Sequence, residues 1–129
     1  MSALRGGTWA AWARRLWPAP WSLLGLLLGA ALLASGGGVQ RRQGVLEFHG
    51  GLLTHAPLPL DAITLGHVIL ARNRALLDIW SSHEQVHVRQ YELWGLLFVP
   101  AYLADSAWQW LHGRRAYLDN HFERQARGL

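Results

Sequence analysis

The sequence predicts a small α+β domain that follows one apolar N-terminal helix, in a chain of 129 residues. Three observations predict this class. An uncharged stretch lies between Arg15 and Arg41, short β-branched apolar runs occupy the middle of the chain, and helical periodicities occupy its last part. The length allows one compact domain plus one appendage.

Composition excludes several classes of function. Residues 1–35 hold three arginines and no acid, which gives +3, whereas residues 36–129 hold nine arginines and eight acids, which gives +1. A basic groove is therefore not indicated, and we expect no nucleic-acid partner. The absence of cysteine excludes disulfides, thiolate zinc sites and iron–sulfur clusters.

Residues 1–15 form a basic tail, and residues 16–35 form an apolar segment that predicts a transmembrane helix or a signal segment. Pro18 and Pro20 fit the start of that helix, where the missing N–H is tolerated. If the segment is cleaved, the small residues Ala34, Ser35 and Gly36 suit the cleavage site and the domain is secreted.

Tryptophans near the start of the apolar segment resemble an interfacial belt, which favours a retained anchor; they are Trp9, Trp12, Trp17 and Trp21. The preceding arginines place the N-terminus in the cytoplasm and the C-terminal domain outside it, so the expected localisation is a single-pass membrane protein. A third reading is a soluble helix buried in the fold.

Residues 36–43 begin with three glycines and predict a linker, after which residues 44–129 form the domain. In residues 43–53, short apolar runs flank Gly50 and Gly51, which predicts a hairpin turned there. Residues 55–61 are a proline-broken connector. Residues 63–71 are β-branched and apolar, which predicts one strand.

Helices are expected in the rest of the chain. A helical pattern begins between Arg74 and Ser81 and ends at Gly95. A second helix covers residues 96–111, and a last one covers residues 121–127 with Asp119 or Asn120 as its cap.

The first of these helices carries His83, Glu84 and His87 in the pattern H-E-x-x-H. On a helix, positions i and i+4 lie about 40° apart in projection and one turn apart along the axis, so both imidazoles can bind one metal ion. Glu84 is then free to take a proton from a water molecule held at the metal.

Each residue of the motif also has a structural explanation. Ser81 and Glu84 match a capping box, in which Glu84 only satisfies the start of a helix. The two histidines then become surface or hydrogen-bonded core residues. This explanation accounts for each residue singly but not for the three together.

A catalytic zinc site needs a third protein ligand. The candidates downstream are Glu92, Asp105, His112, Asp119, His121 and Glu123. Asp105 lies 18 residues after His87, a workable distance for a second helix to return. Glu123 lies 36 residues after His87 at the start of a helix, and the small Ala126 behind it permits close approach.

Together these residues resemble the gluzincin-type zinc metallopeptidases, in particular minimal zincin-like membrane or secreted proteins with HExxH-x-x-Q and a later E-x-x-A helix. The matching residues are His83, Glu84, His87, Gln90, Glu123 and Ala126, and the similarity covers about half the chain. The resemblance implies a zincin-like helical core with a short sheet, and a Zn²⁺ ion.

The resemblance also implies the roles of the site residues: His83, His87 and Glu123 bind the metal, and Glu84 is the general base. One departure is Arg127, which stands where thermolysin-type helices carry an aspartate. The second-shell carboxylate that would orient a ligand histidine is therefore unassigned, and Asp119 is the candidate.

In such folds an edge strand beside the active helix holds the substrate as an added strand, and residues 63–70 are the candidate here. Within them, His67 is expected to be structural. Tyr117 or His121 is a candidate to stabilise an oxyanion, although packing is the expected role of Tyr117.

Three functions follow from these observations. The first is a membrane-anchored zinc metallopeptidase or zincin-like hydrolase acting on a peptide or protein. The second is a catalytically inactive module that binds the metal. The third is a membrane-associated structural or interaction protein without metal, supported by the tryptophan-rich, apolar C-terminal half.

Overall fold

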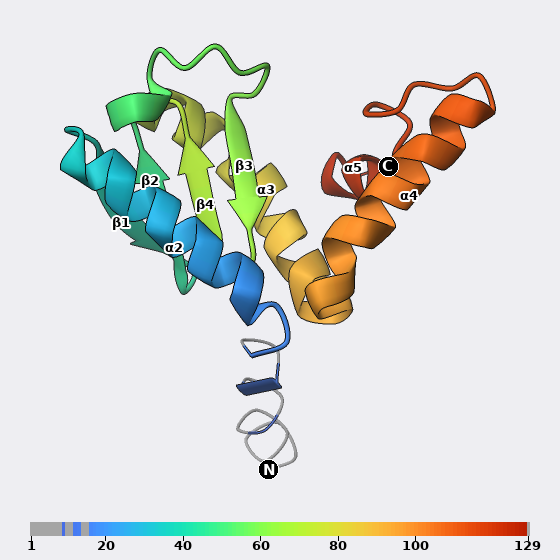
Figure 1. Cartoon of the computed structure of the whole chain (residues 1–129), viewed down its shortest axis with the longest axis horizontal. Coiled ribbons are helices and arrows are strands. Elements are labelled where there is room, and N and C mark those ends of the chain that lie inside the picture. Colours follow the sequence, from blue (N-terminus) through green and yellow to red (C-terminus); the bar gives the residue numbers. More distant parts are fainter. Residues whose placement is uncertain (1–8, 10–11, 14–15, 129) are drawn as a thin grey trace.

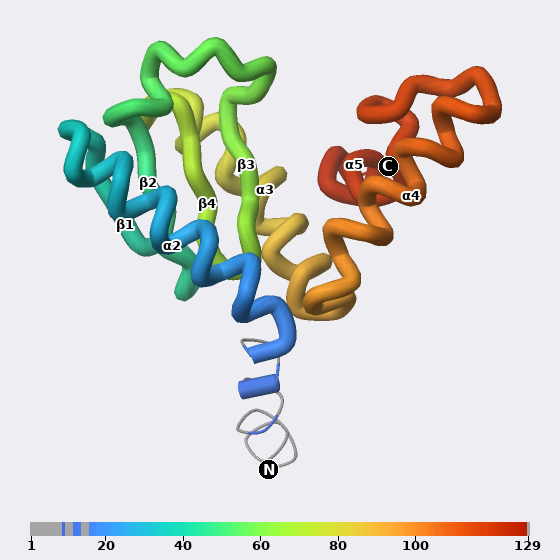
Figure 2. Tube along the Cα trace, viewed as in Figure 1, coloured from blue at the N-terminus to red at the C-terminus, as the bar shows by residue number. Residues whose placement is uncertain are grey.

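The computed structural model describes residues 9, 12–13 and 16–128. A four-stranded mixed sheet lies between helix α2 (Ala19–Ala34) on one face and helix α3 (Arg74–Trp94) on the other (Figure 1). Helices α4 (Phe98–Leu111) and α5 (His121–Ala126) form an arm beside the sheet, and the chain returns so that α5 lies between α3 and α4 (Figure 2). The expected α+β class is confirmed.

The sheet has the strand order β1-β2-β4-β3. Its strands are β1 (Gly38–Arg42), β2 (Val45–His49), β3 (Ala62–Leu65) and β4 (Val68–Ala71). The outer pairs β1–β2 and β3–β4 are antiparallel, whereas the central pair β2–β4 is parallel. Strand β3 is therefore an edge strand, and it borders α3.

The expected hairpin at Gly50 and Gly51 is wrong. The β1–β2 hairpin turns at Gln43 and Gly44, whose φ values of +53° and +76° are both left-handed. Two consecutive positive φ values are typical of a type I′ turn, which matches the twist of the flanking strands. Gly50 and Gly51 instead lead into the 3₁₀ turn η1 (Gly51–Leu53).

The single strand expected over residues 63–71 is also wrong. Gly66 has a φ of +62°, so the apolar run folds into the β3–β4 hairpin. All four residues of β4 are buried, and alternate ones enter different cores. Val68 and Leu70 face α2, whereas Ile69 and Ala71 face α3. Burial on both faces removes the polar alternation that would have revealed a turn.

Residues 36–43 were expected to be a linker, but they contain strand β1. Helix α2 accordingly packs on the sheet through two glycines. A Cβ at Gly25 would come within 2.7 Å of the Val68 Cβ, and one at Gly29 within 2.5 Å of the Phe48 ring. Leu32 completes this inner face of the helix.

In the part of the chain that the structure describes, no helix combines the length and the apolar character needed to cross a bilayer. Most of the basic tail, residues 1–15, lies outside the described residues.

The packing of α2 can be tested by substitution. We expect Gly29→Leu to lower the free energy of unfolding by about 1–3 kcal/mol, because the Phe48 ring leaves no room for a side chain. Ala30→Leu is the matched control, since Ala30 is exposed on the same helix. Denaturant unfolding followed by circular dichroism measures both, and equal stability of the two variants would show that α2 is not docked on the sheet.

The helix ends follow the sequence more closely than the turns do. The Asn73 side chain accepts a hydrogen bond from the Leu76 N–H at 2.8 Å and starts α3, which ends at Gly95 as expected. A 3₁₀ turn, η2 (Gly95–Leu97), then leads into α4. Asn120 caps α5 by accepting from the Phe122 and Glu123 N–H groups.

Candidate metal centre

The H-E-x-x-H residues lie in the interior of α3 and not at its start. Ser81 is eight residues beyond the Asn73 cap, so the capping-box explanation of Glu84 is wrong. The Ser81 hydroxyl instead donates to the Glu47 carboxylate at 2.6 Å. His83, Glu84 and His87 are all buried, and their ligand atoms lie within 4.8 Å of one another.

A buried carboxylate on the sheet fixes the rotation of α3. Glu47, on β2, is fully buried and accepts hydrogen bonds from Ser81 and from the Gln85 amide, which lies 3.4 Å away. Gln40 donates to it at 2.8 Å from the neighbouring strand, and the Arg42 guanidinium lies 3.4 Å away. With these side chains turned toward the sheet, the two motif histidines point away from it, toward α5.

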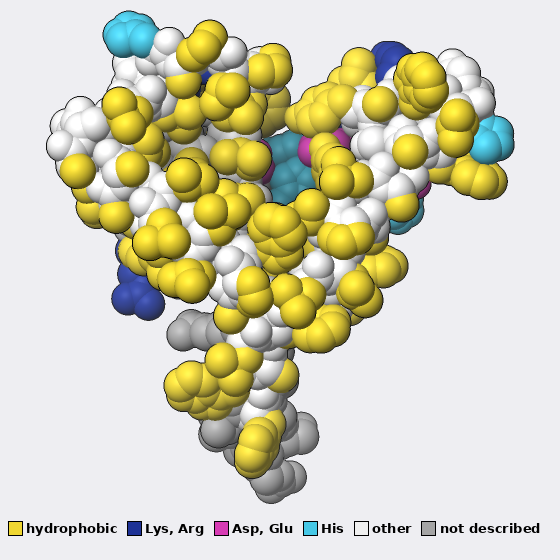
Figure 3. All heavy atoms as spheres, viewed as in Figure 1, with side chains coloured by type: hydrophobic (Ala, Val, Ile, Leu, Met, Phe, Trp, Pro, Cys, Tyr) yellow, Lys and Arg dark blue, Asp and Glu magenta, His cyan; other side chains and the backbone are white. Residues whose placement is uncertain are grey.

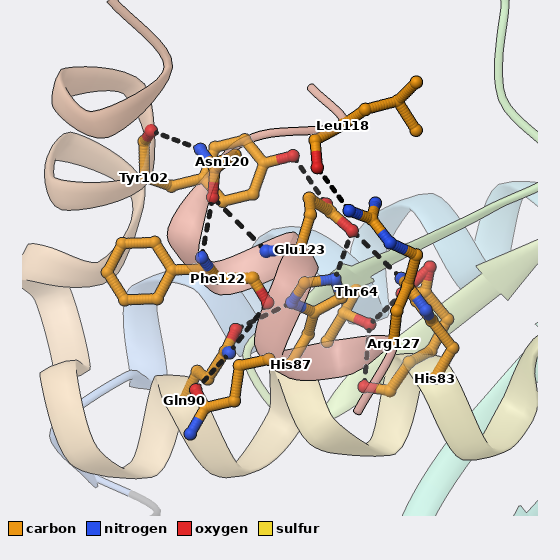
Figure 4. A network of polar contacts seen from close by, with 12 residues as sticks. Thr64, His83, His87, Gln90, Tyr102, Leu118, Asn120, Phe122, Glu123 and Arg127 are labelled. Atoms are coloured by element: carbon orange, nitrogen blue, oxygen red, sulfur yellow. Dashed lines mark hydrogen bonds and ion pairs between the residues drawn. The ribbon is translucent and has the colours of Figure 1, made fainter. Parts of the chain in front are cut away.

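Glu123 meets those histidines from α5. Its Oε1 lies 3.0 Å from Nε2 of His83 and 3.2 Å from Nε2 of His87 (Figure 4). Metal–ligand distances of about 2.0–2.2 Å in a tetrahedral zinc site place neighbouring donor atoms about 3.3–3.6 Å apart. The Glu123 oxygen therefore lies at nearly such a spacing from each imidazole nitrogen, and the three residues fit a small divalent cation.

The partner of His87 on its other ring nitrogen is Gln90. Nδ1 of His87 lies 2.7 Å from the Gln90 Oε1. The Gln90 amide in turn donates to the Phe122 carbonyl at 3.0 Å and to the Gln125 side chain at 2.7 Å, both on α5. Gln90 thus holds the His87 ring with its Nε2 facing Glu123 and ties α3 to α5.

The structure gives Asp119, the sequence candidate for such a role, a different partner. Its carboxylate pairs with Arg115, and this interaction lowers the pKa of Asp119 to about 2. Asp105, the alternative third ligand, accepts a hydrogen bond from the His121 backbone N–H at the start of α5. Neither carboxylate joins the cluster around His83 and His87.

Tyr102 positions the second oxygen of Glu123. The phenol donates to Glu123 Oε2 at 2.5 Å, and burial together with that carboxylate raises the pKa of Tyr102 well above its ordinary range. Asn120 donates to the Tyr102 carbonyl at 3.0 Å while capping the helix that carries Glu123. Sequence reasoning missed Tyr102, because its residue type and spacing carry no metal-site pattern.

Glu84 lies on the cleft side of α3, where Thr64 of the edge strand reaches it. The Thr64 hydroxyl lies 3.0 Å from the Glu84 Oε2 and 3.2 Å from the Glu84 backbone carbonyl. Burial raises the pKa of Glu84 even though His87 and Thr64 act against this. A carboxyl group whose pKa is raised from its ordinary value is better suited to accept and return a proton near neutral pH.

Charge complementarity holds the cluster together. Burial works to raise the pKa of Glu123, but hydrogen bonds to His83 and His87 outweigh it, so its pKa lies far below the ordinary value. Burial likewise works to lower the pKa of His87, and the Glu123 carboxylate overcomes this and raises it. Glu123 is therefore an ionised carboxylate.

A cleft of about 560 Å³ opens beside this cluster. Its walls come from the edge strand β3, from α3 and α4, and from Trp21 at the start of α2; Glu84, His87 and Glu123 line its floor together with Thr64. Tyr117 lines the cleft, and burial raises its pKa to about 12, whereas His121 is exposed. His67 pairs with Glu92 at 2.9 Å, as expected of a structural histidine.

We expect Gln90→Leu to weaken metal binding about 10–100-fold, because the outer-shell partner that orients a ligand histidine is lost. Gln90→Glu keeps an acceptor for the His87 N–H and is expected to retain most of the affinity. Isothermal titration with zinc measures both. Equal affinities for Gln90→Leu and wild type would remove Gln90 from the site.

Comparisons of the chain with protein-family models, with curated proteins and with solved structures found no match.

Proposed function

We propose that the chain is a membrane-anchored, zinc-dependent hydrolase of peptide bonds, with a zincin-like site in which His83, His87 and Glu123 bind the metal and Glu84 is the general base. The observation that carries this proposal is the position of the Glu123 Oε1, 3.0 and 3.2 Å from the two imidazole Nε2 atoms. Two imidazoles and one carboxylate are a donor set typical of catalytic zinc, which keeps a fourth position open.

The residues around that open position divide the chemistry between them. Zinc held by His83, His87 and Glu123 would supply Lewis acidity, which lowers the pKa of a bound water molecule and polarises a carbonyl group. Glu84 takes the proton of the attacking water and passes it to the leaving amine nitrogen, while Thr64 holds the carboxylate in place through its hydroxyl. Glu123 cannot share this role, because both of its oxygens are engaged by His83, His87 and Tyr102.

Strand β3 offers a way to hold an extended substrate. It pairs with β4 on one side only, and all four of its residues, Ala62 to Leu65, line the cleft. A peptide added along this edge would lie across Glu84 and toward the metal ligands. The cleft walls are mainly apolar and aromatic, which favours uncharged side chains at the scissile region.

The proposal is tested by supplying the purified full chain with zinc and a library of extended peptides, and following cleavage by mass spectrometry. We expect cleavage that stops on chelation and returns when zinc is restored. Stoichiometric zinc without cleavage of any peptide would favour the inactive metal-binding module, and a folded chain that binds no metal would end both ideas.

A further inference from the structure

Helix α2 has one side against the sheet and an uncovered side made almost wholly of leucine. Leu32 packs in the core beside Gly25 and Gly29, whereas the other six leucines of the helix are exposed. We call these six the leucine face: Leu23, Leu24, Leu26, Leu27, Leu28 and Leu33. The most exposed of them, Leu27, has 62% of its surface accessible. An amphipathic helix of a water-soluble domain would carry polar residues here.

A second apolar surface adjoins the first. The end of α3 exposes Leu93 and Trp94, the η2 turn that follows exposes Leu96 and Leu97, and η2 contacts α2. Figure 3 shows apolar side chains spread over α2 and α4, on both sides of a notch in which histidine and acidic side chains are visible. Trp21 of α2 lines the cleft itself, so the apolar surface is continuous with the wall of the cleft.

The chemistry of the leucine face points to lipid as its occupant. A protein partner would ordinarily leave a polar rim with hydrogen bonds, but the outer side of α2 between Leu23 and Leu33 offers only Leu and Ala. No charge occurs from Leu16 to Gln40, while Arg14 and Arg15 precede this stretch and Arg41 follows it. Flanking arginines of this kind complement anionic headgroups, and the tryptophans before α2 suit the interface.

We propose that the leucine face and the adjoining η2 turn lie in the headgroup and upper acyl region of an anionic bilayer, with α2 in the membrane plane and the sheet behind it. Docking of the opposite side of α2 on Val68 and Phe48 fixes this orientation relative to the domain. The cleft then opens at the membrane surface. Resting on the proposed function, this makes apolar peptide segments close to that surface the substrate class.

Because the chain lacks cysteine, a single introduced cysteine gives a unique label. The two positions compared are Leu27→Cys on the leucine face and Ile79→Cys on α3, across the sheet, where the side chain is 67% exposed. Each full-length variant, with wild-type stability verified, is labelled with an environment-sensitive fluorophore. It is then mixed with vesicles of phosphatidylcholine and phosphatidylglycerol, with or without nitroxide-labelled lipid.

We expect the label at position 27 to shift to the blue on vesicle addition and to lose most of its emission to nitroxide lipid, whereas the label at position 79 does neither. Omitting phosphatidylglycerol should weaken the response. Equal responses at both positions, or no response at position 27, would overturn the proposal. The emission of the label at position 27 could instead be blue-shifted before any vesicles are added, and remain unchanged by nitroxide lipid. That result would identify a second copy of the chain as the occupant and would also overturn the proposal.

The readout needs neither metal nor catalysis. A chain that binds vesicles but no zinc would contradict the proposed hydrolase function and leave the membrane docking of α2 supported. A chain that binds zinc but whose label does not contact lipid would contradict the membrane docking and leave the proposed hydrolase function untouched.

Discussion

Replacing Glu123 by alanine is expected to weaken zinc binding by more than about 100-fold, since loss of an outer-shell group alone already costs about 10–100-fold. Glu123 is the only carboxylate of the described chain shown within hydrogen-bond distance of both motif histidines, at 3.0 and 3.2 Å. Without it, the two imidazoles on α3 retain only a pair of donors, which is too few for a stable catalytic site.

The experiment compares wild type with Glu123→Ala, Glu123→Gln and Asp105→Ala, using competition with a coloured zinc chelator. Glu123→Gln keeps the shape of the side chain and an acceptor for Tyr102 but removes the charge, so we expect it to bind weakly while folding normally. Asp105→Ala is expected to bind zinc nearly as wild type does. Loss of zinc in Asp105→Ala together with retention in Glu123→Ala would show that the third ligand has been misassigned.

The second large effect is expected for Glu84→Gln, which should lower kcat by about 10²–10⁴-fold with zinc still bound. The amide is isosteric and can still accept the Thr64 hydrogen bond, but it cannot take a proton from water. Because Glu84 is not among the three proposed ligands, the zinc content should remain stoichiometric. This separates the variant from those of the metal ligands.

Glu92→Gln is a suitable control, since Glu92 lies on the same helix and pairs with His67 away from the cleft. Single-turnover cleavage of a peptide found in the library screen gives the rate of the chemical step. A Glu84→Gln chain with wild-type kcat would remove Glu84 as the base, and a chain that also loses its zinc would make Glu84 a ligand.

The sequence carried enough information to bring the metal-site elements together. Gly95 is a strong signal for the end of a helix and Asn120 for the start of one, and in the structure α3 ends before Gly95 and α5 begins after Asn120. The motif spacing places His83 and His87 on one side of α3 by helical geometry alone. Spacing left both Asp105 and Glu123 as candidates for the third ligand, the resemblance implied Glu123, and α5 does bring Glu123 to the two rings.

The turns could not be predicted as well, because the deciding backbone states are poorly encoded. Gln43 adopts a positive φ that its residue type disfavours, so the β1–β2 turn was sought at the glycine pair instead. Gly66 lies inside a run that is apolar on both sides, and the run therefore looks like one strand. The apolar segment 16–35 predicted a transmembrane helix or a signal segment more strongly than a helix buried in the fold. Its composition does not show that Gly25 and Gly29 pack against Val68 and Phe48.

The residues that support the site could not be identified from the sequence, for a different reason. Tyr102, Thr64 and Glu47 act through contacts with α5 or α3 across 20 or more positions in sequence, and their residue types are common in packed cores. Gln90 was part of the matched pattern, but its role depends on α5 lying against α3. Contacts of this long-range kind can be recognised only once the fold is known.

The most direct test of the central claim is the position of zinc in crystals of the zinc-loaded chain, located from anomalous scattering at the zinc edge. The account predicts one peak about 2.0–2.2 Å from Nε2 of His83, from Nε2 of His87 and from a carboxylate oxygen of Glu123. A peak held by other side chains, or two imidazoles turned apart with no zinc between them, would contradict it.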